Sequence, residues 1–471
     1  MIEKYYSGVI EQIYNRIGKE TRNIVMANYS NDFSIENLEV IRRYQSNEDN
    51  VFFAYSEFSY NTLVGAYEPF LDIICNMHRR FIGGSFDDFQ KECGVYYLHR
   101  QVLNSYYETG ECFREETVLL NEVAYEQRRM TMAIVDMLKR LSEVKPLMIV
   151  INRFQMASKS SIETIKYLID HPCTNIGIVL GVNASVKGAD STVEVWDRIV
   201  ESLEDRSAIY YIGSAKPLKN STRTSDDDEL YVTTNFEQSI QEASNTMEFL
   251  DYEQAIRGCR IIEHKIKFEG AWIDEKSLRR FYMVYARTSV LLGELSKALE
   301  LTNEYRALIQ EKNSEHDLSL FYFMKGTCYM YQGKLEKAEN CAKRAYDYAL
   351  LARDDMLEFK SELLSVMIKM SGWYNIFFCV QDIPVSDEII EKLIKHGYRN
   401  HLAHIYIYAY DNSREVVKQA FHDESVLKHF TKGLALAKKI GNEQLVYDAY
   451  QKTIMLASTN GFNEIAFLYV I

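Results

Sequence analysis

Residues 145–168, KPLMIVINRFQMASKSSIETIKYL, constrain the fold more than any other stretch of this 471-residue chain. Leu147–Ile151 is an unbroken apolar run after a proline, the pattern of a parallel strand that is covered on both faces. A polar turn follows, and a helix is predicted next because Ile162, Ile165 and Leu168 are apolar at helical spacing. The order of strand, turn and helix favours an α/β domain.

The tip of this strand has unexpected residue types. In nucleotide-hydrolysing folds built from strand, loop and helix, the tip holds one or two carboxylates that bind Mg²⁺ and orient the attacking water. Here the tip carries Asn152 and Arg153. The sequence therefore predicts the frame of such a site without its acidic groups.

The residues after the strand resemble a motif of the STAND-class ATPases, which join a nucleotide-binding domain to helical repeats, as in maltose-regulator-like transcription activators. Their strand continues as Asp-Asp, an apolar residue, Gln-Trp-Ala-Asp, two variable residues and Ser. This chain reads NRFQMAS over residues 152–158. The positions that match are Gln155, Ala157 and Ser161. The positions that lack the family's acids are Asn152, Arg153 and Ser158.

Residues 24–27 form a short apolar run that is read as a strand, and a second motif of the family, the phosphate-binding loop G-x-x-x-x-G-K-[ST], can be laid over residues 27–34. Ala27 and Asp32 replace its glycines and Phe33 replaces its lysine, so only Ser34 agrees. Glycines let backbone amides surround phosphates and the lysine neutralises them, so tight ATP binding is not expected here. An ordinary strand-to-helix turn capped by Ser34 fits the same residues equally well.

The remaining strand candidates are residues 50–56, 176–182 and 208–212. After its fourth strand the family often has Gly-Thr-Tyr-Arg, whose Arg senses the γ phosphate. This chain has Gly-Val-Asn-Ala from Gly181. Because three sites with separate roles are changed together, the resemblance implies a pseudo-ATPase that is not an enzyme and holds no cofactor.

A helical repeat is predicted from Phe236 onward. The clearest copy resembles a tetratricopeptide repeat, and a second copy lies 40 residues earlier, as Gly293 and Gly333 show. Small residues are expected where two helices approach, and large aromatic residues are expected to fill the space between hairpins. The predicted packing residues are Tyr282, Gly293, Ala298, Tyr322, Gly326, Tyr329, Gly333, Ala338, Ala345, Gly461 and Ala466. Such hairpins stack into a superhelix because none of them closes a core alone.

These observations predict an α/β degenerate P-loop NTPase-like domain followed by an all-α tetratricopeptide-repeat superhelix. The expected boundaries are a degenerate AAA+/STAND nucleotide-binding-like domain at residues 1–213, an acidic linker at 214–235 and repeats at 236–471. The linker is assigned because it is polar, acidic and without periodicity.

The composition restricts the kinds of partner and the cellular location that are expected. The net charge of −13 argues against direct binding of nucleic acid, which favours a basic face. No apolar run approaches the roughly 20 residues of a membrane span. The eight cysteines form no C-x-x-C pair, and no signal peptide is recognised, so a cytoplasmic location is expected. His401 and His404 have metal-ligand spacing but no matching Cys or carboxylate, so packing is preferred and no metal is expected.

Two functions fit the sequence. The first is a regulatory or scaffold protein, in transcriptional or signalling control, whose repeat arm binds proteins: an active STAND-type relative, or another copy of itself. The second is a ligand- or peptide-responsive repeat sensor with weak ATP binding, in which the superhelix captures a peptide or small molecule and shifts a domain arrangement. The five apolar residues of segment 467–471 are expected to pack on a neighbouring hairpin or on another subunit. The sequence does not identify the partner, the ligand or the pathway.

Overall fold

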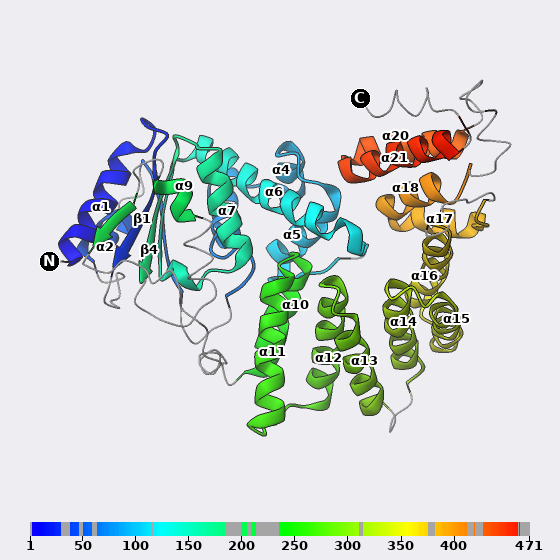
Figure 1. Ribbon diagram of the computed structural model, residues 1–471. Helices are drawn as coiled ribbons and strands as arrows, with labels where there is room; N and C mark the ends of the chain where they lie inside the picture. The colour runs from blue at the N-terminus through cyan, green and yellow to red at the C-terminus, as the bar shows by residue number, and fades with distance from the viewer. Residues whose placement is uncertain are drawn as a thin grey trace. The chain divides into compact units, whose positions relative to one another are not determined.

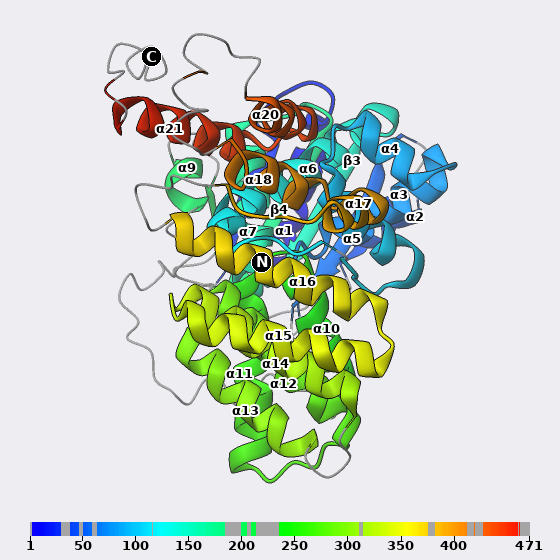
Figure 2. The same cartoon turned by 90° about the vertical axis from the view of Figure 1, so that its right-hand side faces the viewer.

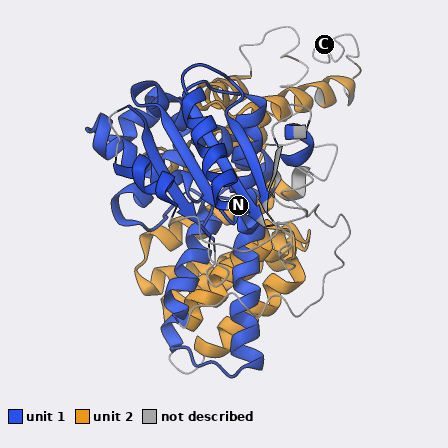
Figure 3. Cartoon of the chain, turned by 90° about the vertical axis from the view of Figure 1, so that its left-hand side faces the viewer, with its two compact units in different colours: residues 1–277 blue, residues 278–471 orange. Residues whose placement is uncertain are grey.

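The computed structural model describes residues 2–29, 38–46, 50–58, 64–114, 116–183, 199–204, 209–212, 235–309, 314–374, 382–411, 419, 427–459 and 461. The chain divides into two compact units, residues 1–277 and residues 278–471 (Figure 3). The predicted linker, apart from Asn235, and the apolar segment 467–471 lie outside the described residues.

A parallel sheet lies at the centre of the first unit. Within the described residues it has five strands in the order β2-β3-β4-β1-β5. Their bounds are β1 (Ile24–Tyr29), β2 (Phe52–Glu57), β3 (Leu147–Asn152), β4 (Ile176–Asn183) and β5 (Ile209–Ile212). Each begins and ends within two residues of the predicted strand. All six residues of β3 are buried, as the unbroken apolar run predicts.

Helices cover both faces of this sheet. Helices α1 (Ile2–Arg16) and α2 (Glu39–Ser46) lie on one face, while α7 (Lys159–Asp170) and α9 (Glu201–Glu204) lie on the other (Figure 1). Helix α1 turns an apolar stripe inward, so Tyr6, Ile10 and Ile13 are fully buried. The other helices before residue 235 are α3 (Phe70–Met77), α4 (Phe86–Glu92), α5 (Tyr97–Thr109) and α6 (Val123–Val144), with short helical turns at His78–Ile82, Leu120–Glu122 and Phe154–Met156.

Helices α10 (Phe236–Glu248) and α11 (Tyr252–Phe268) belong to the first unit by packing. Their turn is bonded to residues that precede α6 or lie within it. The Cys112 amide donates to Asn245 Oδ1 at 2.9 Å, Arg114 Nη2 donates to the Glu248 carbonyl at 2.6 Å, and Gln127 Nε2 donates to the Leu250 carbonyl at 2.6 Å. The division by packing therefore falls after residue 277, whereas the sequence predicts that the helical region separates at residue 236.

The second unit is helical within its described residues. Its elements are α12 (Glu275–Leu291), which begins at the boundary, α13 (Leu295–Ile309), α14 (Glu315–Tyr331), α15 (Leu335–Ala352), α16 (Asp355–Tyr374), α17 (Asp387–His396), α18 (Arg399–Tyr408), α20 (Lys428–Ile440) and α21 (Glu443–Thr459). Helices α14, α15 and α16 lie side by side (Figures 1 and 2). None of the described helices of the chain is long and apolar enough to cross a membrane.

The turns of two hairpins repeat the same hydrogen bonds at the predicted spacing. Gly293 and Gly333 have φ of 76° and 71°, a left-handed conformation that glycine adopts without steric cost. After Gly293, the Glu294 amide donates to the Ser289 carbonyl at 2.8 Å. After Gly333, the Lys334 amide donates to the Tyr329 carbonyl at 2.9 Å. The predicted helical hairpins are therefore present at these two turns.

Small residues allow close helix contact elsewhere in the second unit. A Cβ on Gly326 of α14 would lie 3.2 Å from Leu364 Cδ2 and 3.3 Å from Cys341 Cβ. A Cβ on Gly433 of α20 would lie 2.8 Å from Ile407 Cγ1 and 3.0 Å from the Ile407 amide nitrogen. At this glycine, α20 therefore lies close to both the backbone and a side chain of α18.

The Gly433→Ala substitution tests this contact. Because backbone atoms of α18 cannot rotate away, the added methyl group is expected to lower the free energy of unfolding of the second unit by about 1–3 kcal/mol. Thermal unfolding followed by circular dichroism measures the loss. The control is Lys432→Ala at the neighbouring exposed position, which should have little effect on stability. Equal losses in the two variants would contradict the close contact at Gly433.

Candidate functional site

The carboxyl ends of the strands form the first candidate site. Strand β1 lies between β4 and β5, although the chain runs from β1 to β2 at the far edge and only later returns to β4. Open parallel sheets bind ligands outside the carboxyl ends of their strands where the chain order reverses in this way. A bound nucleotide would therefore be expected at the tips of β1, β3 and β4.

At this edge an ion pair joins β2 to the tip of β3. The Arg153 guanidinium lies 3.1 Å from Glu57 Oε1, and Asn152 Nδ2 donates to the same oxygen at 3.1 Å. The Tyr55 hydroxyl donates to the other oxygen, Glu57 Oε2. Arg153 Nη1 also approaches the Phe58 carbonyl at 3.4 Å. Glu57 is the only carboxylate among these described residues, and it already accepts from three side chains. Arg153 gives the β3 tip a positive charge.

The backbone at Arg153 is held in an unusual conformation. Its φ of 56° and ψ of 40° are left-handed, which costs a residue other than glycine about 1–2 kcal/mol. The next residue, Phe154, is fully buried and begins a short helical turn. Ser158 then caps α7, since its hydroxyl accepts from the Ser161 amide at 3.4 Å. Arg153 is therefore fixed between the buried strand and the buried start of this turn.

The proposed phosphate-loop positions are only partly described. Ala27 lies inside β1, opposite Gly181 of β4 and Tyr210 of β5, rather than in a loop. The strand continues to Tyr29, two residues beyond the apolar run in the sequence. Asp32, Phe33, Ser34 and Ala184 lie outside the described residues.

A cavity of about 380 Å³ lies elsewhere in the first unit, beside α6, α7 and the α10–α11 turn. Asp251 lies at its edge and caps two helices, because it accepts from the Ser160 amide of α7 at 2.9 Å and from the Gln254 amide of α11 at 3.3 Å. Burial raises the pKa of this carboxyl, against the hydrogen bonds from Ser160. Nearby, burial raises the pKa of Glu68 to about 7. The contact between α7 and the α10–α11 turn is therefore both polar and buried.

Sequence inspection missed Glu57 and Asp251. Glu57 is the last residue of an edge strand, and nothing in the sequence showed that Arg153 would be its partner. Asp251 has a recognisable signal: a short acidic residue stands immediately before a helix that contains Ala255 and Ile262 at apolar positions, which is the pattern of an N-cap.

The predicted repeat residues are mostly at helix contacts. Ala298, Ala338 and Ala345 are fully buried, and Tyr282 is nearly so. Tyr329 packs against a cluster that includes Met330 and Ala338. Tyr322 of α14 stacks on Tyr348 of α15, the other helix of the same hairpin, with ring centroids 5.6 Å apart. Gly461 has a left-handed backbone, and Ala466 lies outside the described residues.

The histidines with metal-ligand spacing pack on aromatic rings. His401 and His404 are buried, and their rings lie beside Tyr398 and Tyr408. Among the residues that the structure describes, no group of three or more His, Cys, Asp and Glu side chains is arranged to hold a metal ion.

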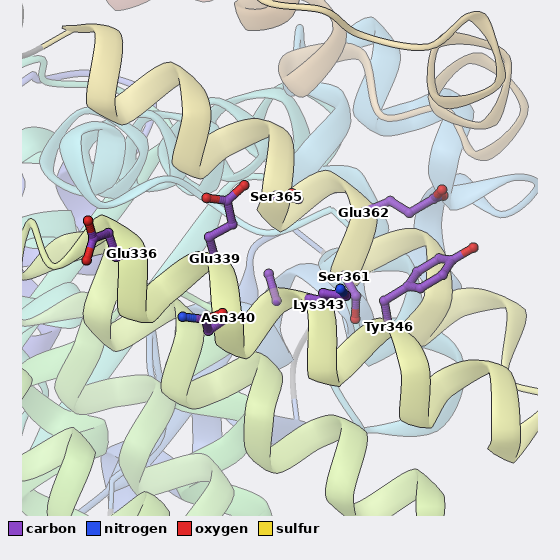
Figure 4. Close-up of a pocket in the computed structure, with 9 residues that line it drawn as sticks. Glu336, Glu339, Asn340, Lys343, Tyr346, Ser361, Glu362 and Ser365 are labelled. Atoms are coloured by element: carbon purple, nitrogen blue, oxygen red, sulfur yellow. The ribbon is translucent and has the colours of Figure 1, made fainter.

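The second candidate site is a groove of about 590 Å³ between α15 and α16 of the second unit (Figure 4). Its lining residues are Glu336, Glu339, Asn340, Ala342, Lys343, Tyr346, Ser361, Glu362 and Ser365. The volume is typical of sites that bind small molecules or short peptide segments.

Comparison with models of known protein families and with curated proteins found no match to this chain. The geometry of the two candidate sites is therefore the basis for the functional argument.

A double-mutant cycle tests whether the Arg153–Glu57 pair holds the strand tips. Arg153→Asn keeps a residue that tolerates the left-handed backbone, and Glu57→Gln keeps the side-chain shape. We expect each change to cost about 1–2 kcal/mol in unfolding free energy and the pair to show a coupling of about 1 kcal/mol. Urea unfolding with hydrogen exchange of β2 and β3 amides measures this. Strictly additive losses would show that the two groups do not interact.

Proposed function

We propose that this protein is a non-catalytic regulatory or scaffold protein: a pseudo-ATPase of the STAND type whose helical arm, built from tetratricopeptide-like repeats, binds proteins. The observation that carries the proposal is the strand tip, where Arg153 is paired with Glu57 at 3.1 Å. A guanidinium there repels Mg²⁺ and cannot coordinate it, because it offers donors and no lone pair.

The guanidinium at the strand tip is also unfavourable for phosphoryl transfer. Phosphoryl transfer depends on metal ions that neutralise charge between the β and γ phosphates and on a group that orients the nucleophile. Glu57 is a carboxylate bonded directly to the β3 tip, and its two oxygens already accept from Asn152, Arg153 and Tyr55. Releasing it for Mg²⁺ would leave the Arg153 charge half-buried without its partner, which is costly.

The helical arm supports the binding half of the proposal. Its hairpins repeat one turn geometry, and Gly326, Ala338 and Ala345 keep the helices close. In stacked hairpins the contacts within the stack are separate from the outward side chains, so the surface can be specialised for a partner while the packing is retained. Other proteins, including an active relative or a second copy of this chain, are the partners that we propose.

The cavity beside Asp251 offers a place for a ligand and so supports a second candidate function, a ligand- or peptide-responsive sensor. A ligand held there would contact both α7 and the α10–α11 turn. Ligands act on conformation only through a difference in affinity between two states. A ligand-dependent change in the hydrogen exchange of α10 and α11 would support this alternative over a passive scaffold.

The pseudo-ATPase half is tested by turnover. Purified full-length protein with ATP and Mg²⁺ is expected to release phosphate no faster than buffer, because the strand tip provides a cation where a metal ligand is needed. The control is Arg153→Asn, which removes the cation but supplies no acid and should also be inactive. Steady turnover by the wild type that is lost in a Gln155→Ala variant would overturn the proposal.

A further inference from the structure

The groove between α15 and α16 contains a buried polar group without a partner. Ser361 is 1% exposed, and its hydroxyl has no hydrogen-bond partner among the residues that the structure describes. It lines the groove together with the exposed side chains of α15. An unsatisfied buried hydroxyl costs about 1–3 kcal/mol, and an occupant that reaches it with a polar atom would remove that cost.

Charge on the groove is mainly negative. Glu336 and Glu339 are exposed along α15, one helical turn apart, and neither forms an ion pair within the described part of the chain. At the other end, Glu362 lies 2.9 Å from Lys392, which also pairs with Glu358 and Glu388. Lys343 is the one cation among the described lining residues. The carboxylates without an internal partner are therefore those of Glu336 and Glu339.

The shape favours a chain segment rather than a compact ligand. The lining of α15 extends from Glu336 to Tyr346, which is about 15 Å along a helix axis. About four or five extended residues span that length. Figure 4 shows Glu336, Glu339 and Lys343 following α15, with Ser361 and Glu362 on the adjacent α16.

We propose that this groove binds an extended basic segment of a partner protein, with a lysine or arginine side chain at Glu336 and Glu339 and a backbone group at the Ser361 hydroxyl. The inference rests on the proposed scaffold function and specifies the chemistry of its partner. Charge-assisted hydrogen bonds to the two glutamates supply most of the selectivity, and Ser361 fixes the register of the segment.

The test uses full-length protein and a fluorescent seven-residue peptide in which alanine alternates with lysine and arginine, followed by anisotropy. We expect saturable binding that weakens with salt, whereas a peptide with glutamate at the basic positions should not bind. Glu336→Gln with Glu339→Gln should weaken binding at least tenfold, and Ser361→Ala about two- to tenfold. Glu304→Gln, an exposed acid of α13 outside the groove, is the control and should change nothing.

Two further measurements separate binding from stability and from simple charge attraction. Ser361→Ala removes an unpartnered hydroxyl, so its thermal stability should be equal to that of the wild type or higher while its affinity falls. Spermidine should compete only weakly, because it lacks a backbone. Failure of the basic peptide to bind, equal loss in Glu304→Gln, or competition by spermidine as strong as by unlabelled peptide would overturn this inference. None of these results would alter the outcome of the ATP turnover assay, so the two proposals fail separately.

Discussion

The ion pair between Arg153 and Glu57 sets the charge at the carboxyl ends of β2 and β3. It lies at the edge where a parallel sheet of this order presents a ligand site, and it joins the tips of two neighbouring strands. Asn152 and Tyr55 complete the set of donors around the same carboxylate. The same groups therefore place a guanidinium at the β3 tip and hold the tips of β2 and β3 together.

A second constraint is the contact that Asp251 makes with both α7 and α11. One buried carboxylate caps α7, which follows the altered strand tip, and α11, which belongs to the first helical hairpin. Because both helices depend on the same group, the α10–α11 hairpin packs as part of the sheet unit. Beyond residue 277 the hairpins have their own core, in which glycine and alanine set the distances between helices. The chain thus combines a unit built around a parallel sheet with a helical unit that carries the acidic groove.

The fold was largely predictable because its signals are local. The apolar run 147–151 is long enough to specify a buried strand, and glycines 40 residues apart specify matching helix turns. The contacts of the candidate sites were not predictable, because they join residues far apart in sequence. Arg153 meets Glu57 only through the pairing of β2 with β3, and Ser361 lies opposite Lys343 only through the packing of α15 on α16. The domain boundary differed for the same reason, since Asn245 and Glu248 bond to residues 112 and 114. The STAND and tetratricopeptide assignments remain predictions.

We propose that this chain binds a partner through the helical unit and binds no nucleotide at the sheet edge, and hydrogen–deuterium exchange of the full-length protein tests this proposal most directly. The protein is measured alone, with ATP and Mg²⁺, and with the basic peptide. The account predicts that the peptide slows exchange in residues 336–346 and 361–365, while nucleotide leaves residues 147–153 unchanged. Protection of the β3 tip by nucleotide, without protection of the groove by peptide, would contradict it.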